Sequence, residues 1–159
     1  MLLQANHNYQ ERGMNTVIYT SSVDDRYGKR EIVSRIGLRA KSNIFSETTN
    51  IYEEVVNLNK NKRVDCVLID EAQFLNKNQV EQLGKIVDIL DTPVLTFGIR
   101  TDFKGNLFEG SEYLLAWADN LKEIKTVCHC GRKATMVLRL DENGNVLETG
   151  DQIEIGGNE

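Results

Sequence analysis

The sequence has 159 residues, 40% of them hydrophobic and 27% charged, which supports one packed core and excludes wholesale disorder. The 24 acidic residues outnumber the 19 basic ones, and the net charge of −5 argues against binding duplex nucleic acid through a broad basic face. No stretch approaches the roughly 20 apolar residues of a membrane span, no secretory signal is recognisable, and three cysteines in a chain this long favour a reduced, cytoplasmic protein.

The first predicted elements are a helix, a strand and a long loop. Residues 2–12 are predicted as a helix that ends at Gly13, because glycine readily adopts the left-handed conformation that closes a helix. Residues 16–20 form a β-branched and aromatic run that predicts a buried strand. Residues 21–41 are polar and rich in charge, and we predict a long surface loop there.

Helices and apolar strands then alternate along the chain. A helix is predicted to start at Asn50 and another at Asn76, each with a Glu or Gln three residues later as in a capping box. Buried strands are predicted at residues 64–69 and 94–99, where the apolar runs are continuous. Continuous apolar strands separated by helices are typical of a parallel sheet covered by helices, so the predicted fold class is α/β.

The pattern changes near residue 126. A short helix is predicted at residues 111–118, and after residue 126 the chain becomes rich in short strands and turns. Two strands are predicted at residues 135–140 and 146–148, because the Asn-Gly pair between them suits the turn of a hairpin. The sequence therefore divides into an α/β part, residues 1–126, and a smaller β-rich part, residues 127–159.

Two acids, Asp70 and Glu71, directly follow the predicted strand at residues 64–69. In open parallel sheets, side chains at the carboxyl ends of strands face the ligand crevice. The arrangement is that of a Walker B segment, in which the first acid holds Mg²⁺ and the second faces the attacking nucleophile. The plain alternative is a pair of acids that ends a strand and caps the next turn. The phosphate-binding loop G-x-x-x-x-G-K-[ST] that accompanies a Walker B segment is not found in this sequence.

Cys128 and Cys130 are separated by a single residue and followed by glycine. This spacing suits one half of a tetrahedral zinc site, although a complete site needs two more ligands. Two alternatives are a pair of incidental thiols on a turn and a redox pair, the latter without the strand-to-helix setting of C-x-x-C oxidoreductases. The third cysteine, Cys66, lies inside a predicted strand and is expected to be a core residue.

Short segments in a fixed order carry a family resemblance. They are NYQERG at 8–13, DDRYG at 24–28, SRIG at 34–37, DEAQF at 70–74, GIRTDFKGNLF at 98–108, SEYLLAWAD at 111–119, CHCGRKA at 128–134 and IGGNE at 155–159. Together they resemble the type II (bacterial and cellular-type) thymidine kinases, in particular enterobacterial-like members, over essentially the whole chain.

The resemblance implies a P-loop-kinase-like parallel sheet in residues 1–126, as a nucleotide-binding domain, and a small zinc-binding, ribbon-like subdomain in residues 127–159. It implies an ATP:thymidine 5′-phosphotransferase, which transfers the γ-phosphate of ATP to the 5′-hydroxyl of thymidine for DNA precursor salvage. It further implies Mg²⁺, structural Zn²⁺ bound by Cys128 and Cys130, feedback inhibition by dTTP, a homotetramer, and no nucleic-acid or membrane partner.

The resemblance also implies roles for single residues. Glu71 would be the general base that takes the 5′-hydroxyl proton, and Asp70 the acid behind Mg²⁺. Phe103 would stack on the thymine base, where the plain alternative is a core aromatic. Arg35 would reach phosphates from a mobile lid, where the plain alternative is a solvated loop. The other implied contacts are to nucleotide, at Ala72 and Gln73, and to the pyrimidine, at Gln152, Ile153, Glu154, Ile155 and Gly156.

The family's Walker A loop would precede Met1, and its second pair of zinc ligands would follow Glu159, so we expect this sequence to be the middle of a longer enzyme. Two alternative functions follow from the residues themselves. One is a non-catalytic truncated fragment or binding module. The other is a nucleic-acid-stimulated P-loop ATPase, which DEAQ also suggests but which needs a second motor domain and a basic track.

Overall fold

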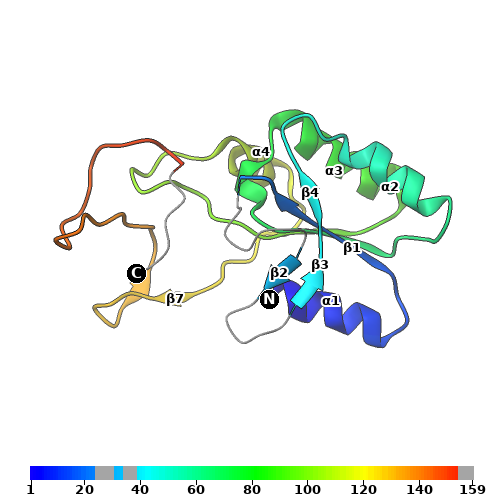
Figure 1. The fold of residues 1–159 in the computed structure, drawn as a ribbon, viewed down its shortest axis with the longest axis horizontal. Helices are drawn as coiled ribbons and strands as arrows, with labels where there is room; N and C mark the ends of the chain where they lie inside the picture. Colours follow the sequence, from blue (N-terminus) through cyan, green and yellow to red (C-terminus); the bar gives the residue numbers. More distant parts are fainter. Residues whose placement is uncertain (24–30, 34–38, 154–159) are drawn as a thin grey trace.

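The centre of the molecule is a sheet of four parallel strands in the order β4-β1-β5-β6 (Figure 1). The computed structural model describes residues 1–23, 31–33 and 39–153. The strands of the sheet are β1 (Thr16–Ser21), β4 (Asn43–Phe45), β5 (Cys66–Ile69) and β6 (Val94–Thr96). All three strand pairs are parallel, so the predicted α/β class with a parallel sheet is confirmed.

Helices cover both faces of this sheet. Figure 1 shows α1 on one side of the sheet and α2 and α3 on the other. The helices are α1 (Leu2–Glu11), α2 (Ile51–Asn59), α3 (Lys77–Leu90) and α4 (Glu109–Trp117). Two separate clusters of buried side chains result, one beneath α1 and a larger one beneath α2 and α3. Among the described residues, no helix combines the length and apolar character needed to cross a bilayer.

The predicted helix ends are confirmed in detail. Gly13 follows α1 with a φ of 73°, the left-handed conformation expected of it. The Asn50 side chain accepts the backbone N–H of Glu53 at the start of α2. Asn76 and Gln79 form a complete capping box at the start of α3. Each cap satisfies backbone donors that the first helical turn leaves without partners.

Two predictions for the strands need correction. The segment predicted as a surface loop contains a two-stranded antiparallel sheet of β2 (Glu31–Val33) and β3 (Arg39–Lys41), and is followed by β4. These strands have three residues each, too short for a hydrophobic period to stand out among the charges. Strand β6 was predicted to be buried, but Leu95 is 37% exposed because β6 is the edge strand of the described sheet.

The β-rich part also differs from its prediction. Residues 135–140 and 146–148 do not form strands; only an isolated bridge joins Leu140 to Val146. The strands that do form are β7 (Thr126–Val127) and β8 (Lys133–Ala134), which pair antiparallel. In Figure 1 this part of the chain extends away from the parallel sheet. Its apolar side chains are largely exposed, with Val127 at 73% and Leu138 at 52%, so no second apolar core fixes longer strands within residues 127–153.

Candidate active site

The two acids lie at the carboxyl end of β5, in a turn that we call the acid turn (residues 70–74). Its backbone is held from both sides: the Asp70 N–H donates to Tyr19 O on β1 at 2.8 Å, and the Ala72 N–H donates to Phe97 O, beyond β6, at 2.9 Å. After Glu71 the chain enters the short 3₁₀ helix η1 (Ala72–Phe74). The acid turn therefore sits at the edge of the sheet where ligands of open parallel sheets bind.

Glu71 has a left-handed backbone conformation, with φ 52° and ψ 41°. For a residue with a side chain this conformation costs on the order of 1–3 kcal/mol, and it persists only where the surroundings hold it. The Glu71 side chain forms no capping hydrogen bond to η1, so the alternative of acids that merely cap the next turn does not describe this residue. The strain instead marks Glu71 as a candidate functional group.

The Gln73 side chain connects Glu71 to the loop after β6. Its Nε2 donates to Glu71 Oε2 at 2.5 Å, and its Oε1 accepts the Ile99 N–H at 3.3 Å. Gln73 is only 4% exposed. A buried amide bonded at both ends holds its partners in one arrangement, because breaking either bond would leave a buried polar group unsatisfied.

Two glycines press against the acid turn from the ends of the loop at residues 98–110. A Cβ on Gly98 would lie 2.6 Å from Gln73 Oε1, and one on Gly110 would lie 2.6 Å from Ala72 O and 2.7 Å from Leu75 O. Neither position has room for a side chain. Sequence reasoning missed both glycines, since each close approach joins residues at least 25 positions apart; their place at the end of β6 and the start of α4 was the available signal.

The loop between these glycines is built around Asp102. The Asp102 side chain is 3% exposed, and its Oδ1 accepts the N–H groups of Lys104 and Asn106, each at 2.9 Å. A backbone bridge between Thr101 and Leu107 closes the loop. Burial alone would raise the pKa of the Asp102 carboxyl, but the hydrogen bonds from Asn106 and Lys104 outweigh it, and the pKa lies below its ordinary value. Asp102 therefore holds the loop in shape as a carboxylate.

Phe103 lies at the tip of this loop and is half-buried. The Arg139 guanidinium lies over its ring, 4.1 Å from the ring centroid. Gln152 reaches the same loop, donating from Nε2 to Leu107 O at 3.4 Å, so the structure brings these two predicted site residues to one loop. By contrast Phe108 is a core aromatic, 6% exposed and edge-on to Phe74. The Asp102 and Arg139 contacts were not predicted from the sequence.

Cys128 and Cys130 lie at the tip of the β7–β8 hairpin. The Cys128 N–H donates to Arg132 O at 2.7 Å, and the Gly131 N–H to Cys128 O at 2.9 Å, so the chain folds tightly around the two thiols. The pKa of the Cys130 thiol is lowered, first by the backbone N–H of Arg132 and then by the Cys128 thiol. This suits a metal ligand, since zinc binds the thiolate. Among the described residues, however, no group of three or more metal-ligating side chains gathers. Cys66, as predicted, is a core residue, and burial raises the pKa of its thiol.

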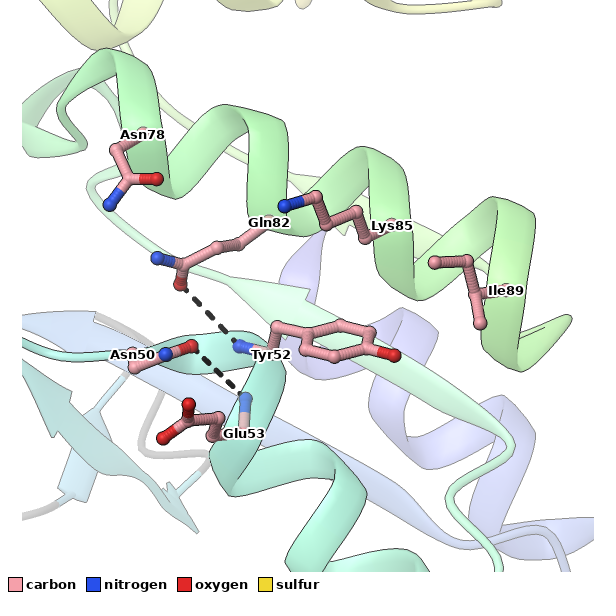
Figure 2. A pocket seen from close by; sticks show the side chains of 7 residues that line it. All are labelled: Asn50, Tyr52, Glu53, Asn78, Gln82, Lys85 and Ile89. Atoms are coloured by element: carbon pink, nitrogen blue, oxygen red, sulfur yellow. Dashed lines mark hydrogen bonds between the residues drawn. The ribbon is translucent and has the colours of Figure 1, made fainter.

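The remaining predicted site residues are one exposed residue and four that the structure does not describe. Arg35, Glu154, Ile155 and Gly156 lie outside the described residues, and Ile153 is 46% exposed. An open pocket of about 430 Å³ lies between the N-terminus of α2 and one face of α3, and Figure 2 shows the side chains that line it. Gln82 from α3 closes its floor by accepting the Ile51 N–H at 2.8 Å, which caps α2. None of the residues that line this pocket is a predicted site residue.

Acidification should open the loop around Asp102. Because the pKa of this carboxyl is depressed in the folded state, its contribution to stability is fully present above the unfolded value of about 3.9 and is lost as pH falls through the lower folded value. In NMR spectra, the amide signals of Lys104 and Asn106 should therefore move together in a single titration below about pH 4. The Asp102→Asn variant should lack that titration; if it titrates like the wild type, Asp102 is not the group responsible.

Comparison with known proteins adds the family. The chain matches the thymidine kinase family over residues 1–159. It is 58% identical over 158 residues to a thymidine kinase of Vibrio vulnificus, covering 99% of this chain and 82% of that protein. It is 55% identical to the thymidine kinase of Mannheimia succiniciproducens, over 99% of this chain and 81% of that protein, and 54% identical to that of Salmonella typhimurium, over 99% and 77%. The family match over residues 1–159 and the similarity to these enzymes over 99% of this chain lead to one conclusion: the chain belongs to the thymidine kinase family.

Proposed function

We propose that this chain carries the acid turn of an ATP:thymidine 5′-phosphotransferase, with Glu71 as the general base. The observation that supports this most is the Glu71 carboxylate held at the carboxyl edge of the parallel sheet, on a strained turn and against Gln73. The chain belongs to the thymidine kinase family. An acid at the carboxyl end of a strand in an open parallel sheet faces the crevice in which ligands bind.

The proposed reaction is an in-line displacement. The 5′-oxygen of thymidine attacks the γ-phosphorus of ATP, the bond to the β,γ-bridging oxygen breaks, and ADP leaves as dTMP forms. Glu71 accepts the proton that the 5′-hydroxyl gives up, and Asp70 would hold Mg²⁺, which neutralises phosphate charge when bound. Oxygen ligands such as the Asp70 carboxylate are those that Mg²⁺ prefers. The nucleotide contacts proposed from the family lie along the acid turn, through the backbone of Ala72 and Gln73, and at Arg35.

Phe103 is the proposed stacking partner of the thymine base. Its ring lies at the tip of the loop with two cations over it, the Arg139 guanidinium at 4.1 Å and the Lys104 ammonium at 5.6 Å from the centroid. Stacking of the base on this ring would contribute about 1–3 kcal/mol. The segment from Gln152 to Gly156 is the proposed backbone contact with the pyrimidine. The hydrogen bond from Gln152 to Leu107 O supports this, because it places the start of that segment beside the loop that carries Phe103.

Cys128 and Cys130 are the proposed ligands of a structural zinc ion. Both thiols lie on one tight hairpin, and the lowered pKa of Cys130 fits a thiolate ligand. The two thiols would supply half of a tetrahedral set. The ion would fix the β7–β8 hairpin, whose strands have only two residues each.

Three further proposals rest mainly on the family: a homotetramer, feedback inhibition by dTTP, and a cytoplasmic location. Exposed apolar side chains on and after α4 support the homotetramer, with Trp117 at 49%, Leu121 at 62% and Ile124 at 56% exposed. Side chains of this kind in one stretch of a chain are typical of a surface that another subunit covers.

A phosphate-transfer assay tests the proposed function. The full-length protein, given γ-labelled ATP, Mg²⁺ and thymidine, should transfer the label to thymidine, and ATP hydrolysis should not depend on DNA. DNA-stimulated hydrolysis without labelled dTMP would instead support a nucleic-acid-stimulated ATPase. Calorimetry with thymidine on the 159-residue chain alone separates binding from turnover, and binding without transfer would support the non-catalytic alternative for this length of chain.

A further inference from the structure

We propose that Gln73 is a positioning residue: it orients the Glu71 carboxylate and couples it to the loop that begins at Gly98 and carries Phe103. The inference rests on the proposed role of Glu71 and assigns Gln73 a task other than contact with nucleotide. It predicts that the Glu71 carboxylate is correctly oriented only while the loop at residues 98–110 is in place.

The first step is the direction of the Gln73 amide. Its nitrogen faces a carboxylate oxygen, Glu71 Oε2, and its oxygen faces an N–H donor, that of Ile99. A carboxylate can only accept and an N–H can only donate, so this is the one orientation of the amide that satisfies both neighbours. Glutamine presents this donor and this acceptor without titrating, and the arrangement therefore favours glutamine at position 73.

The second step is the anchor at the other end. The backbone of Ile99 is held at both of its polar groups, because its N–H donates to Gln73 Oε1 and its carbonyl accepts the Ser111 hydroxyl at 2.7 Å. Ser111 is itself 6% exposed and belongs to α4. The Gln73 amide is therefore anchored through Ile99 to α4. Its hydrogen bond to Glu71 consequently holds the carboxylate in one orientation.

The third step is the room that Gly98 provides. A Cβ at this position would meet Gln73 Oε1 at 2.6 Å, Gln73 N at 3.1 Å and Ala72 N at 3.2 Å. The nearest atom is the side-chain oxygen, so a larger residue at 98 would first displace the amide that holds Glu71. Gly98 therefore provides the space in which the Gln73 side chain can hold Glu71.

The fourth step separates this role from a nucleotide contact. The Gln73 side chain is 4% exposed and both of its polar ends are bonded inside the protein. A side chain so engaged would have to give up buried hydrogen bonds before it could reach a phosphate or a base. Its effect on catalysis is therefore expected to pass through Glu71.

The test is a mutant cycle in the full-length enzyme. Gln73→Met removes both hydrogen bonds at similar volume, and a displaced base should lower kcat by about 10- to 100-fold, since a misplacement of about 1 Å can cost 100-fold. Calorimetric affinities for thymidine and ATP should stay within about twofold of the wild type, as neither ligand loses a contact. In the Glu71→Gln background the same change should lower the remaining turnover by less than about twofold, because no base is left to aim.

Two more variants keep the test decisive. Gln73→Glu retains the acceptor for Ile99 but loses the donor to Glu71, so it should lose turnover even if Gln73→Met does not fold. Gly98→Ala should lower kcat, because its Cβ would lie 2.6 Å from Gln73 Oε1 and displace the amide that holds Glu71. Gly84→Ala is the matched control: its Cβ would meet nothing within 4 Å, and turnover should not change.

The outcomes distinguish the possible failures. Wild-type kcat in Gln73→Glu, with Glu71→Gln inactive, overturns this inference alone. An equal loss from Gln73→Met in both backgrounds shows a merely structural role, and a raised KM for ATP at unchanged kcat shows a nucleotide contact; either result also overturns it. Wild-type turnover in Glu71→Gln instead refutes the proposed function on which the inference rests.

Discussion

Replacing Glu71 by glutamine should lower the turnover of thymidine phosphorylation by about 100- to 10,000-fold, the usual range for loss of a general base. Glutamine has nearly the same shape but cannot take the 5′-hydroxyl proton. Its amide oxygen can still accept from Gln73 Nε2, so the strained turn with φ 52° should persist. The melting temperature and the thymidine affinity should therefore change little, and single-turnover transfer of labelled phosphate should isolate the loss to the chemical step.

The matched control is Glu81→Gln, the same substitution on an exposed position of α3. It removes one negative charge without touching the acid turn, and turnover should equal that of the wild type. If Glu71→Gln keeps turnover within about tenfold of the wild type, the loss is too small for a general base, and another group must take the proton. If it loses thymidine affinity instead, Glu71 acts in binding.

The features predictable from the sequence are local ones. The starts of α2 and α3 follow from Asn50 and Asn76, whose side chains bond to N–H groups three residues away. Asp70 and Glu71 could be placed at a strand end because the apolar run before them is continuous. Each of these inferences needs only a few neighbouring residues, which is why it could be made without coordinates.

The features that could not be predicted depend on contacts distant in the chain. No sequence pattern near Gln73 predicts its hydrogen bond to Ile99, which lies 26 positions away. The exposure of β6 depends on its place at the edge of the sheet, and the strand order cannot be read from periodicity. The left-handed conformation of Glu71 is likewise imposed by its surroundings, since glutamate itself does not favour it.

One missed feature did have a local signal. The loop around Asp102 and a second loop around Asp141 share the pattern Asp-x-x-Gly-Asn. In both, the aspartate Oδ1 accepts the N–H groups two and four residues later. The pattern would have identified Asp102 as the residue that shapes the loop carrying Phe103. It also accounts for the tight turn at residues 141–145, which the bridge between Leu140 and Val146 closes.

Replacing Gly110 by alanine should destabilise the protein and impair catalysis together. The added Cβ would meet three backbone carbonyl oxygens of the acid-turn region, those of Ala72, Leu75 and Gln73, at 2.6, 2.7 and 2.9 Å. Backbone atoms cannot rotate aside, so α4 or the acid turn must shift. We expect a loss of about 3 kcal/mol, the upper part of the range for overpacking. That corresponds to a melting temperature lower by about 6–12 °C for a protein of this size.

The Gly84→Ala variant is the control for this prediction. Both changes put alanine into a helix, which by propensity alone stabilises by roughly 0.5–1 kcal/mol. At Gly84 nothing lies within 4 Å of the new Cβ, so that gain should appear as a slightly higher melting temperature. At Gly110 the steric contact should instead lower the melting temperature. The kcat should fall as well when the acid turn moves, because Glu71 is held in place both by its own strand and by α4. Gly110→Ala with wild-type melting temperature and kcat would mean that α4 does not press on the acid turn, and the loop ending at Gly110 could not help to position the base.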